Sequence, residues 1–195
     1  TVGHAPDAGV AEASVAISAA RGALDSWRAT PIEERCALLG RLADLLEERA
    51  PSWAVLVQAE TGSTVTITET LQVAGGLIDR FRYYSRPRSI DSAELPLAQG
   101  ASALGAAGLV AAAVHHEPVG VVLCITPYNF PLTNVAGKIA PALAMGNTCI
   151  IKPAPQDPLG ILRLGEAIVD AGFPPGVVNI VVSSGAEVPA AMVAS

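Results

Sequence analysis

The feature that most constrains the fold of this chain is an alternation of apolar runs and helix-like stretches over residues 119–182. The run VGVVLCI is rich in β-branched residues and lacks polar alternation, which predicts a strand buried on both faces. NTCIIKP predicts a second buried strand, and GVVNIVV predicts a third strand. Of the two helical stretches between them, one begins at Pro131 and ends at Gly146, and the other begins with Asp157-Pro158 and ends at Gly172. Right-handed crossovers make such strands parallel, so the sequence predicts β-α-β-α-β, half of a doubly wound nucleotide-binding sheet.

The first 85 residues carry helical patterns. Helices are predicted over 10–28, in a leucine-rich stretch that begins at 31, over 53–60 and over 64–84. Thr30, Pro31 and Glu33 have the spacing of a capping box with proline at the first helical position, and Ser52 after Pro51 is predicted to cap the third helix.

A change of composition separates these helices from the strands. Residues 86–99 are punctuated by prolines and predict a connector, and residues 102–116, with glycines in the middle, predict a hairpin. The predicted fold class is therefore α/β, a helical N-terminal region followed by half of a Rossmann-like parallel sheet.

Composition excludes several classes of function. The formal net charge is -6 and the basic residues are scattered, which argues against nucleic acid or an anionic membrane as a partner. Cys36, Cys124 and Cys149 have no metal-ligand spacing, so no metal site is predicted. Unpaired thiols and an N-terminus without a secretory pattern predict a cytoplasmic protein, in which Cys124 and Cys149 act as small apolar residues of the strands.

Two polar residues follow the first two predicted strands. Asn129 lies in TPYNFP and Lys152 in IIKPAP, and loops at the carboxyl ends of parallel strands share one edge of the sheet. A carboxamide offers two N–H donors that can stabilise an oxyanion, and an ammonium can bind ribose hydroxyls or phosphate. The pattern alone leaves open that Asn129 caps the next helix and that Lys152 is a solvated strand-end lysine. No GxGxxG is present, and SSGAE at 183–187 could open a helix toward phosphate.

Three segments, EPVGVVLCITPYNFPL, KIAPALAMGNTCIIKPAPQDPL and AGFPPGVVNIVV, resemble the NAD(P)-dependent aldehyde dehydrogenase superfamily in order and spacing. The resemblance is strong over 117–182 and looser upstream. It implies oxidation of an aldehyde to a carboxylic acid by NAD(P)+, with Asn129 donating its amide to the oxyanion formed when a catalytic Cys adds to the carbonyl. Cofactor-binding positions implied by the resemblance are Ile125, Thr126, Pro127, Tyr128, Lys152, Ala154, Pro155 and Gly185.

The sequence departs from the family pattern beside the cofactor. Pro155 stands where many NAD-preferring members have Glu, so no carboxylate there would repel a 2′-phosphate, and NADP becomes plausible beside NAD. Ser183 and Ser184 stand where glycines are expected, and Gly185 is kept.

The resemblance also divides the chain. It implies a helical part of the cofactor-binding domain over 1–100, an oligomerisation-type hairpin over 101–118 and a truncated Rossmann-like half over 119–195. Homo-oligomers, dimers or tetramers, are the implied assembly.

The family's general-base Glu and nucleophilic Cys lie beyond Ser195. The chain is therefore expected to be the N-terminal segment of a larger enzyme, or to pair with a complementary C-terminal chain, and to be inactive alone. The alternatives are a non-catalytic scaffold or interaction subunit derived from this fold and, third, use of Cys124 or Cys149 as nucleophile.

Overall fold

The computed structural model describes residues 1–87, 93–101, 107–114 and 116–195. Their helices and strands, in chain order, are α1 (Val10–Ala29), α2 (Ile32–Thr61), the π-helix η1 (Ile67–Ile78), α3 (Asp79–Tyr84), β1 (Ala93–Ala101), β2 (Ala107–Val114), β3 (Val121–Ile125), α4 (Pro131–Ala144), β4 (Thr148–Lys152), α5 (Leu159–Asp170), β5 (Val178–Ile180) and α6 (Glu187–Val193).

The predicted β-α-β-α-β unit is confirmed as a parallel sheet with strand order β3-β4-β5. Strand β4 lies in the middle and is buried along its whole length, as expected for a central parallel strand. The same expectation is wrong for β3, which is half-buried over much of its length and ends at an exposed Ile125. The reason is its place at the sheet edge, where one face borders a cavity of about 140 Å³ beside Val121 and Leu123.

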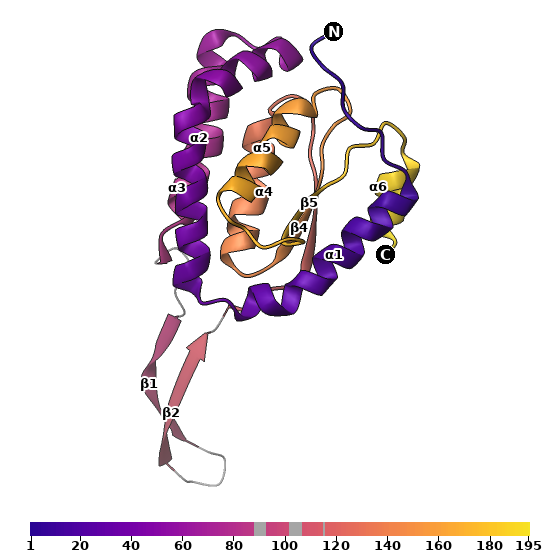
Figure 1. Ribbon diagram of the computed structural model, residues 1–195. Helices are drawn as coiled ribbons and strands as arrows, with labels where there is room; N and C mark the ends of the chain where they lie inside the picture. The colour runs from indigo at the N-terminus through magenta and orange to yellow at the C-terminus, as the bar shows by residue number, and fades with distance from the viewer. Residues whose placement is uncertain (88–92, 102–106, 115) are drawn as a thin grey trace.

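Helices cover both faces of the sheet (Figure 1). Cys149 and Ile151 of β4 point into the larger core, which α4 and α5 form with the outer layer of α2, η1 and α3. Ile150, between them, points into a second core made with α1 and α6. The alternation along β4 thus assigns successive side chains to two cores on opposite faces.

The second and third predicted helices are one helix. Pro51 lies inside α2, where a missing backbone N–H ordinarily costs about 3 kcal/mol. Trp53, two residues later, is fully buried, and its indole Nε1 donates a hydrogen bond to the Gly160 carbonyl at 3.3 Å. Packing of this segment on α5 offsets the defect. Thr30 does not cap α2 either, because its hydroxyl donates back to the Ser26 carbonyl of α1.

The helical pattern of 64–84 is confirmed as helix, with a widened first part. η1 covers residues 67–78 and continues into α3. It lies against α4, and the Thr133 hydroxyl donates a hydrogen bond to the Leu71 carbonyl at 3.3 Å. Gly76 makes this approach possible, because a Cβ there would overlap Thr133 Oγ1 and the Leu71 carbonyl oxygen.

We expect Gly76→Ala to destabilise the protein by about 1.5 kcal/mol, a cost typical of a methyl group forced into a filled contact. Urea unfolding of parent and variant measures it. Gly22→Ala is the matched control, because a Cβ at this helical glycine meets nothing within 4 Å. Equal free energies of unfolding for the two variants would show that the contact between η1 and α4 can accommodate an added methyl group.

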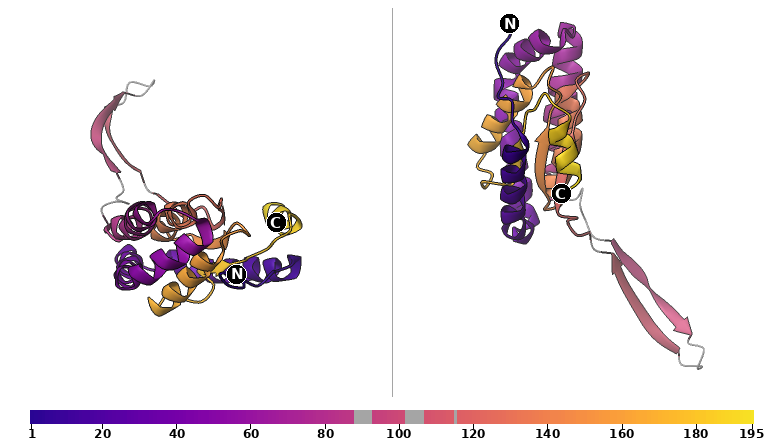
Figure 2. Two further views of the ribbon diagram at one scale, coloured as in Figure 1. Left: turned by 90° about the horizontal axis from the view of Figure 1, so that it is seen from above. Right: turned by 90° about the vertical axis from the view of Figure 1, so that its right-hand side faces the viewer.

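The hairpin is longer than predicted. β1 pairs antiparallel with β2, from Ala93 opposite Val114 to Ala101 opposite Ala107. Residues 93–99, assigned to the connector, are therefore strand, while 102–106 and 115 of the predicted hairpin lie outside the described residues. The register shifts between Leu95 and Ala98, around a proline that cannot donate to the ladder. Figures 1 and 2 show the hairpin projecting from the body of the molecule.

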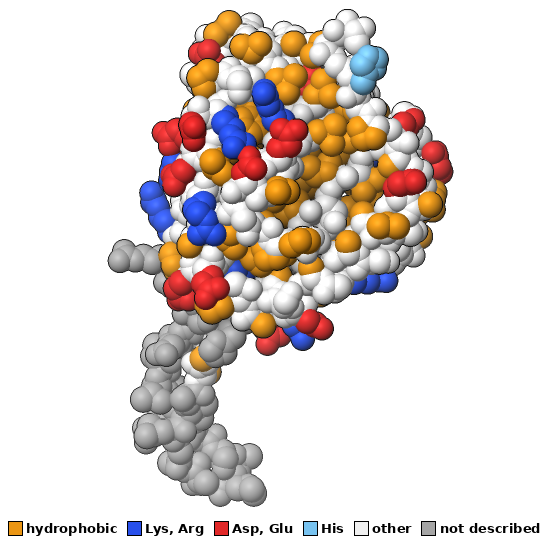
Figure 3. All heavy atoms as spheres, viewed as in Figure 1, with side chains coloured by type: hydrophobic (Ala, Val, Ile, Leu, Met, Phe, Trp, Pro, Cys, Tyr) orange, Lys and Arg blue, Asp and Glu red, His pale blue; other side chains and the backbone are white. Residues whose placement is uncertain are grey.

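Over the described part of the chain, no helix is both long and apolar enough to cross a membrane, and no group of three or more His, Cys, Asp or Glu side chains is arranged to hold a metal ion. On the face shown in Figure 3, acidic and basic side chains are intermingled over α2, and apolar side chains gather over the middle. The described residues of that face therefore form no continuous basic patch.

Candidate functional site

The carboxyl ends of the three parallel strands bring the predicted site loops to one edge of the sheet. The ladder continues past the strands, since the Thr126 amide donates to the Lys152 carbonyl at 3.1 Å and the Val181 amide donates to the Ile151 carbonyl at 2.9 Å. The loops that follow β3, β4 and β5 are thus held side by side, as the βαβ topology requires.

Asn129 lies exposed in the loop between β3 and α4. The N-cap of α4 is Phe130, and no side chain caps the helix, so the capping interpretation of Asn129 is wrong. The Phe130 carbonyl instead accepts a hydrogen bond from Asn134 Nδ2 at 2.9 Å. Within the described residues nothing hydrogen-bonds the Asn129 carboxamide, so both of its N–H donors are available to a ligand.

Lys152 is not the solvated lysine that the pattern allowed. Only 6% of it is exposed, and its Nζ donates to the Pro153 carbonyl at 3.0 Å and to the Ser183 carbonyl at 2.9 Å. Burial lowers the pKa of Lys152, and the nearby Asp7 carboxylate opposes that shift. The ammonium therefore bridges the loops after β4 and β5, and its third donor remains for a ligand.

The other predicted cofactor residues surround Lys152 and Asn129 at this edge. Thr126 and Ala154 are buried, and Gly185 is half-buried. Exposed positions are Ile125, Pro127, Tyr128 and Pro155. The hydroxyls of Thr126 and Ser183 are buried without a hydrogen-bond partner, which makes each of them a polar group that a bound ligand could satisfy.

The N-terminal segment joins the site, which sequence reasoning missed. Asp7 accepts hydrogen bonds from the Ser184 amide and the Ser184 hydroxyl, both at 2.7 Å, and the Ala8 amide donates to the Val182 carbonyl at 2.8 Å. These bonds with Ser184, and the neighbouring Lys152, lower the pKa of Asp7. No local pattern marks a contact between residues so far apart in the chain.

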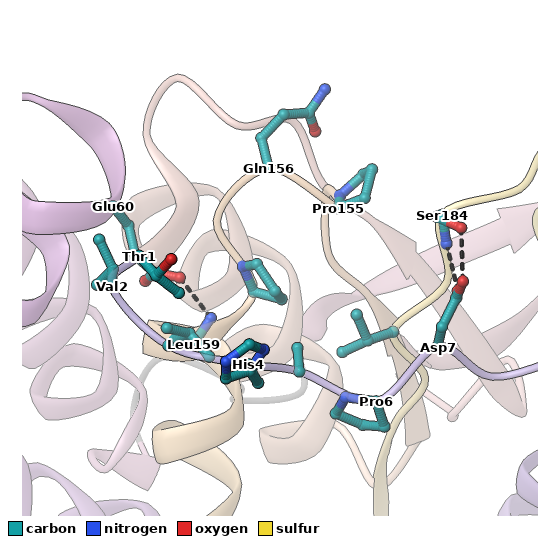
Figure 4. A pocket seen from close by; sticks show the side chains of 14 residues that line it. Thr1, Val2, His4, Pro6, Asp7, Glu60, Pro155, Gln156, Leu159 and Ser184 are labelled. Carbon is teal, nitrogen blue, oxygen red and sulfur yellow. Dashed lines mark hydrogen bonds between the residues drawn. The ribbon is translucent and has the colours of Figure 1, made fainter.

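A pocket of about 440 Å³ opens between this segment and the loops after β4 and β5 (Figure 4). Asp7 and Ser184 line one side of it, Pro155 and Gln156 another, and Glu60 lies near its far end. Asn129 and Lys152 do not line this pocket. The candidate site therefore has two parts, an open loop around Asn129 and a pocket beside Pro155.

Two neighbouring carboxyl groups belong to Glu60, which lines the pocket, and to Asp157, which is buried. Glu60 of α2 accepts hydrogen bonds from the Leu159 and Gly160 amides at 2.6 and 2.8 Å and so caps α5 from another helix. Asp157, predicted to be that cap, is buried with Oδ1 unpartnered. Burial, followed by the charge of Glu60, raises the pKa of Asp157 to about 7.

The cysteines do not offer an accessible nucleophile. Cys124 and Cys149 have no exposed surface, and Cys36 is buried and donates to the Tyr84 carbonyl. A hydrogen bond with Cys124 and burial raise the pKa of Cys149. The prediction that Cys124 and Cys149 are core residues is confirmed, and their use as nucleophiles has no support.

Comparisons with known proteins agree with this architecture. The profile of the aldehyde dehydrogenase family matches residues 1–195. The chain is 37% identical to the mitochondrial aldehyde dehydrogenase of Leishmania tarentolae over 185 residues, which cover 95% of this chain and 35% of the relative. It thus spans about a third of that protein's length.

Two solved structures have the same fold. An aldehyde dehydrogenase from Bacillus cereus in complex with NAD+ superimposes with a TM-score of 0.84 at 34% identity, covering 96% of this chain and 37% of that one. An NADP dependent enzyme from E. coli gives a TM-score of 0.84 at 32% identity, over 95% of this chain and 37% of that one. With a family profile that matches along its whole length, the chain belongs to the aldehyde dehydrogenase family.

Proposed function

We propose that this chain is the part of an aldehyde dehydrogenase that supplies the oxyanion donor Asn129 and much of the NAD(P)+ cleft. The complete protein oxidises an aldehyde to a carboxylic acid. The observation that carries the proposal is the Asn129 carboxamide, exposed and without a partner in the described residues at the carboxyl end of β3. Membership of the family supports the reaction class.

In this proposal Asn129 acts on the oxygen of the aldehyde carbonyl. When a thiolate adds to the carbonyl carbon, the π electrons move to oxygen, and an N–H of Asn129 donates to the resulting oxyanion. The three thiols of this chain are buried, so the nucleophile is assigned to another part of the complete protein. Because the donor is already in place, it needs no reorganisation as the charge develops.

Lys152 and the two unpartnered hydroxyls fit a dinucleotide at the same edge. NAD(P)+, when bound, accepts the hydride. The third N–H of the Lys152 ammonium can bind a ribose hydroxyl, and the hydroxyls of Thr126 and Ser183 are polar groups that lack partners. Relatives solved with NAD+ and one named for NADP both share this fold, so either cofactor is compatible with it.

The projecting hairpin supports an oligomer. A two-stranded ribbon is marginal on its own, and both β1 and β2 have one edge without a partner strand in the described structure. We assign it to a contact with a second copy of the chain in a homo-oligomer. The unpaired thiols favour a cytoplasmic location.

The test is an assay of the complete protein with a panel of aliphatic and aromatic aldehydes and either NAD+ or NADP+. We expect reduced cofactor and carboxylic acid to form in equal amounts with at least one aldehyde, at about 1–10³ per second, the usual range for enzymes. Residues 1–195 alone are expected to give no turnover. A complete protein that binds neither cofactor would refute the proposal and favour the scaffold alternative.

A further inference from the structure

The Asp7 carboxylate and the Lys152 ammonium interact through their charges. The pKa of Lys152 is raised by the charge of Asp7 against the effect of burial, and the pKa of Asp7 is lowered in part by Lys152. Ser184 fixes the direction of the carboxylate by two hydrogen bonds of 2.7 Å, one to each oxygen. Each oxygen keeps a further lone pair for a ligand hydroxyl, because an ionised carboxylate has about four acceptor sites. The peptide group between Ser183 and Ser184 connects the two side chains, since its carbonyl accepts from Lys152 Nζ and its N–H donates to Asp7.

The pocket next to this carboxylate is poor in positive charge. Among the described residues that line it are two carboxylates, Asp7 and Glu60, one imidazole, His4, and no Lys or Arg (Figure 4). Pro155, on its rim, has no polar side-chain atom and cannot hold a ribose hydroxyl. The one carboxyl group of the same loop, Asp157, is buried and does not line the pocket, so a carboxylate for a sugar at this end of the site comes from another segment, and Asp7 lines the pocket.

Ribose hydroxyls and a phosphate make opposite demands on such a group. A carboxylate at the edge of a dinucleotide site accepts hydrogen bonds from ribose hydroxyls, whereas arginine accommodates a 2′-phosphate. A phosphate next to Asp7 would place like charges within a few ångströms, in a pocket whose described lining contains no Lys or Arg side chain.

We propose that Asp7 is a specificity-determining residue that makes the site prefer NAD+ to NADP+. The proposal rests on the proposed function, and it adds that a residue of the N-terminal segment takes the role for which Pro155 offers no carboxylate. The replacement of an acidic residue by Pro155 leaves both NAD+ and NADP+ open as cofactors, and the role of Asp7 favours NAD+.

The experiment is calorimetric titration of the complete protein with NAD+ and NADP+ separately, before and after Asp7→Asn. Asparagine keeps an oxygen for the Ser184 amide and removes the charge. We expect the parent to bind NAD+ at least about 10-fold more tightly than NADP+, and the ratio of the two Kd values to fall about 10-fold in the variant, the effect of roughly one like-charge contact. Asp7→Ser, a shorter neutral side chain, is expected to lower the ratio similarly.

Asp25→Asn is the matched control, because Asp25 is an exposed carboxylate of α1 and the change in net charge is the same. It should leave the ratio unchanged. Raising the salt concentration provides a measurement on the parent alone. Because salt screens the repulsion between the Asp7 carboxylate and the 2′-phosphate, the preference for NAD+ over NADP+ should become smaller.

The outcomes separate the two proposals. The specificity role is overturned if the parent binds NADP+ more tightly than NAD+, or if Asp7→Asn weakens the binding of both cofactors equally. Either result leaves the proposed function in place. Binding of neither cofactor to a folded parent removes the proposed function, and the specificity role with it.

Discussion

Replacing Asn129 by alanine in the complete protein lowers kcat by about 10²–10³-fold, the usual loss when one oxyanion donor is removed. The side chain is exposed and makes no hydrogen bond to described residues, so the melting temperature is expected to stay within about 2 °C of the parent. Because the donor acts on charge that exists only after the nucleophile adds, kcat should fall much more than the affinity for aldehyde. Steady-state kinetics with NAD(P)H detection measures both.

Two further variants make this test specific. Asn129→Asp keeps the shape but replaces the donors with a negative charge, so it should be at least as slow as the alanine variant. Tyr83→Phe, at an exposed residue of α3 outside the site, removes a hydroxyl and keeps the ring, and its kcat should stay within about threefold of the parent. An unchanged kcat in Asn129→Ala would rule out the oxyanion role.

Replacing Asp157 by asparagine removes a pH-dependent loss of stability. The folded-state pKa of Asp157 is about 7 and its ordinary value is 3.8, so the folded protein binds this proton more tightly than the unfolded chain. Stability from that proton is present at low pH and is lost as the pH rises from about 4 through 7. At about 1.4 kcal/mol per pH unit, the advantage of Asp157→Asn over the parent should grow by about 2–3 kcal/mol between pH 5 and pH 8.

Urea unfolding at several pH values measures this difference. Asp25→Asn, at an exposed site on α1, is the control for the loss of one carboxyl group. A pH profile of Asp157→Asn parallel to that of the parent would mean that the carboxyl group is ionised or solvated in the folded protein at neutral pH. Glu60 should not serve as the control, because burial raises its pKa in the same direction.

Elements bounded by local signals could be predicted from the sequence. α4 begins at Pro131, and the chain leaves α4 and α5 through Gly146 and Gly172, both with positive φ. Each of these signals acts within one turn of helix. Pro51 shows the limit of such reasoning, because the packing of Trp53 against α5 decides that α2 continues, and nothing near Pro51 in the sequence encodes that contact.

The residues of the candidate site also differ in whether they could be predicted from the sequence. Asn129 and Lys152 could be chosen because parallel topology puts both at one edge, and their exposure and burial then came from the structure. Asp7 could not be found, since its partner Ser184 is 177 positions away. Glu60 likewise caps a helix that begins 99 residues later. Contacts of this kind depend on the three-dimensional arrangement of segments whose own sequences carry no sign of it.

The hydrogen bonds between Asp7–Ala8 and Val182–Ser184 also affect how the protein folds during its synthesis. The ribosome delivers Asp7 long before Ser184, and at about 5–20 residues per second the delay is roughly 10–35 s. Until then the first residues have no partner for these hydrogen bonds, and this edge of the sheet is incomplete. Nascent chains halted before Ser184 should therefore expose their N-terminal residues to proteases, and those halted well after it should not.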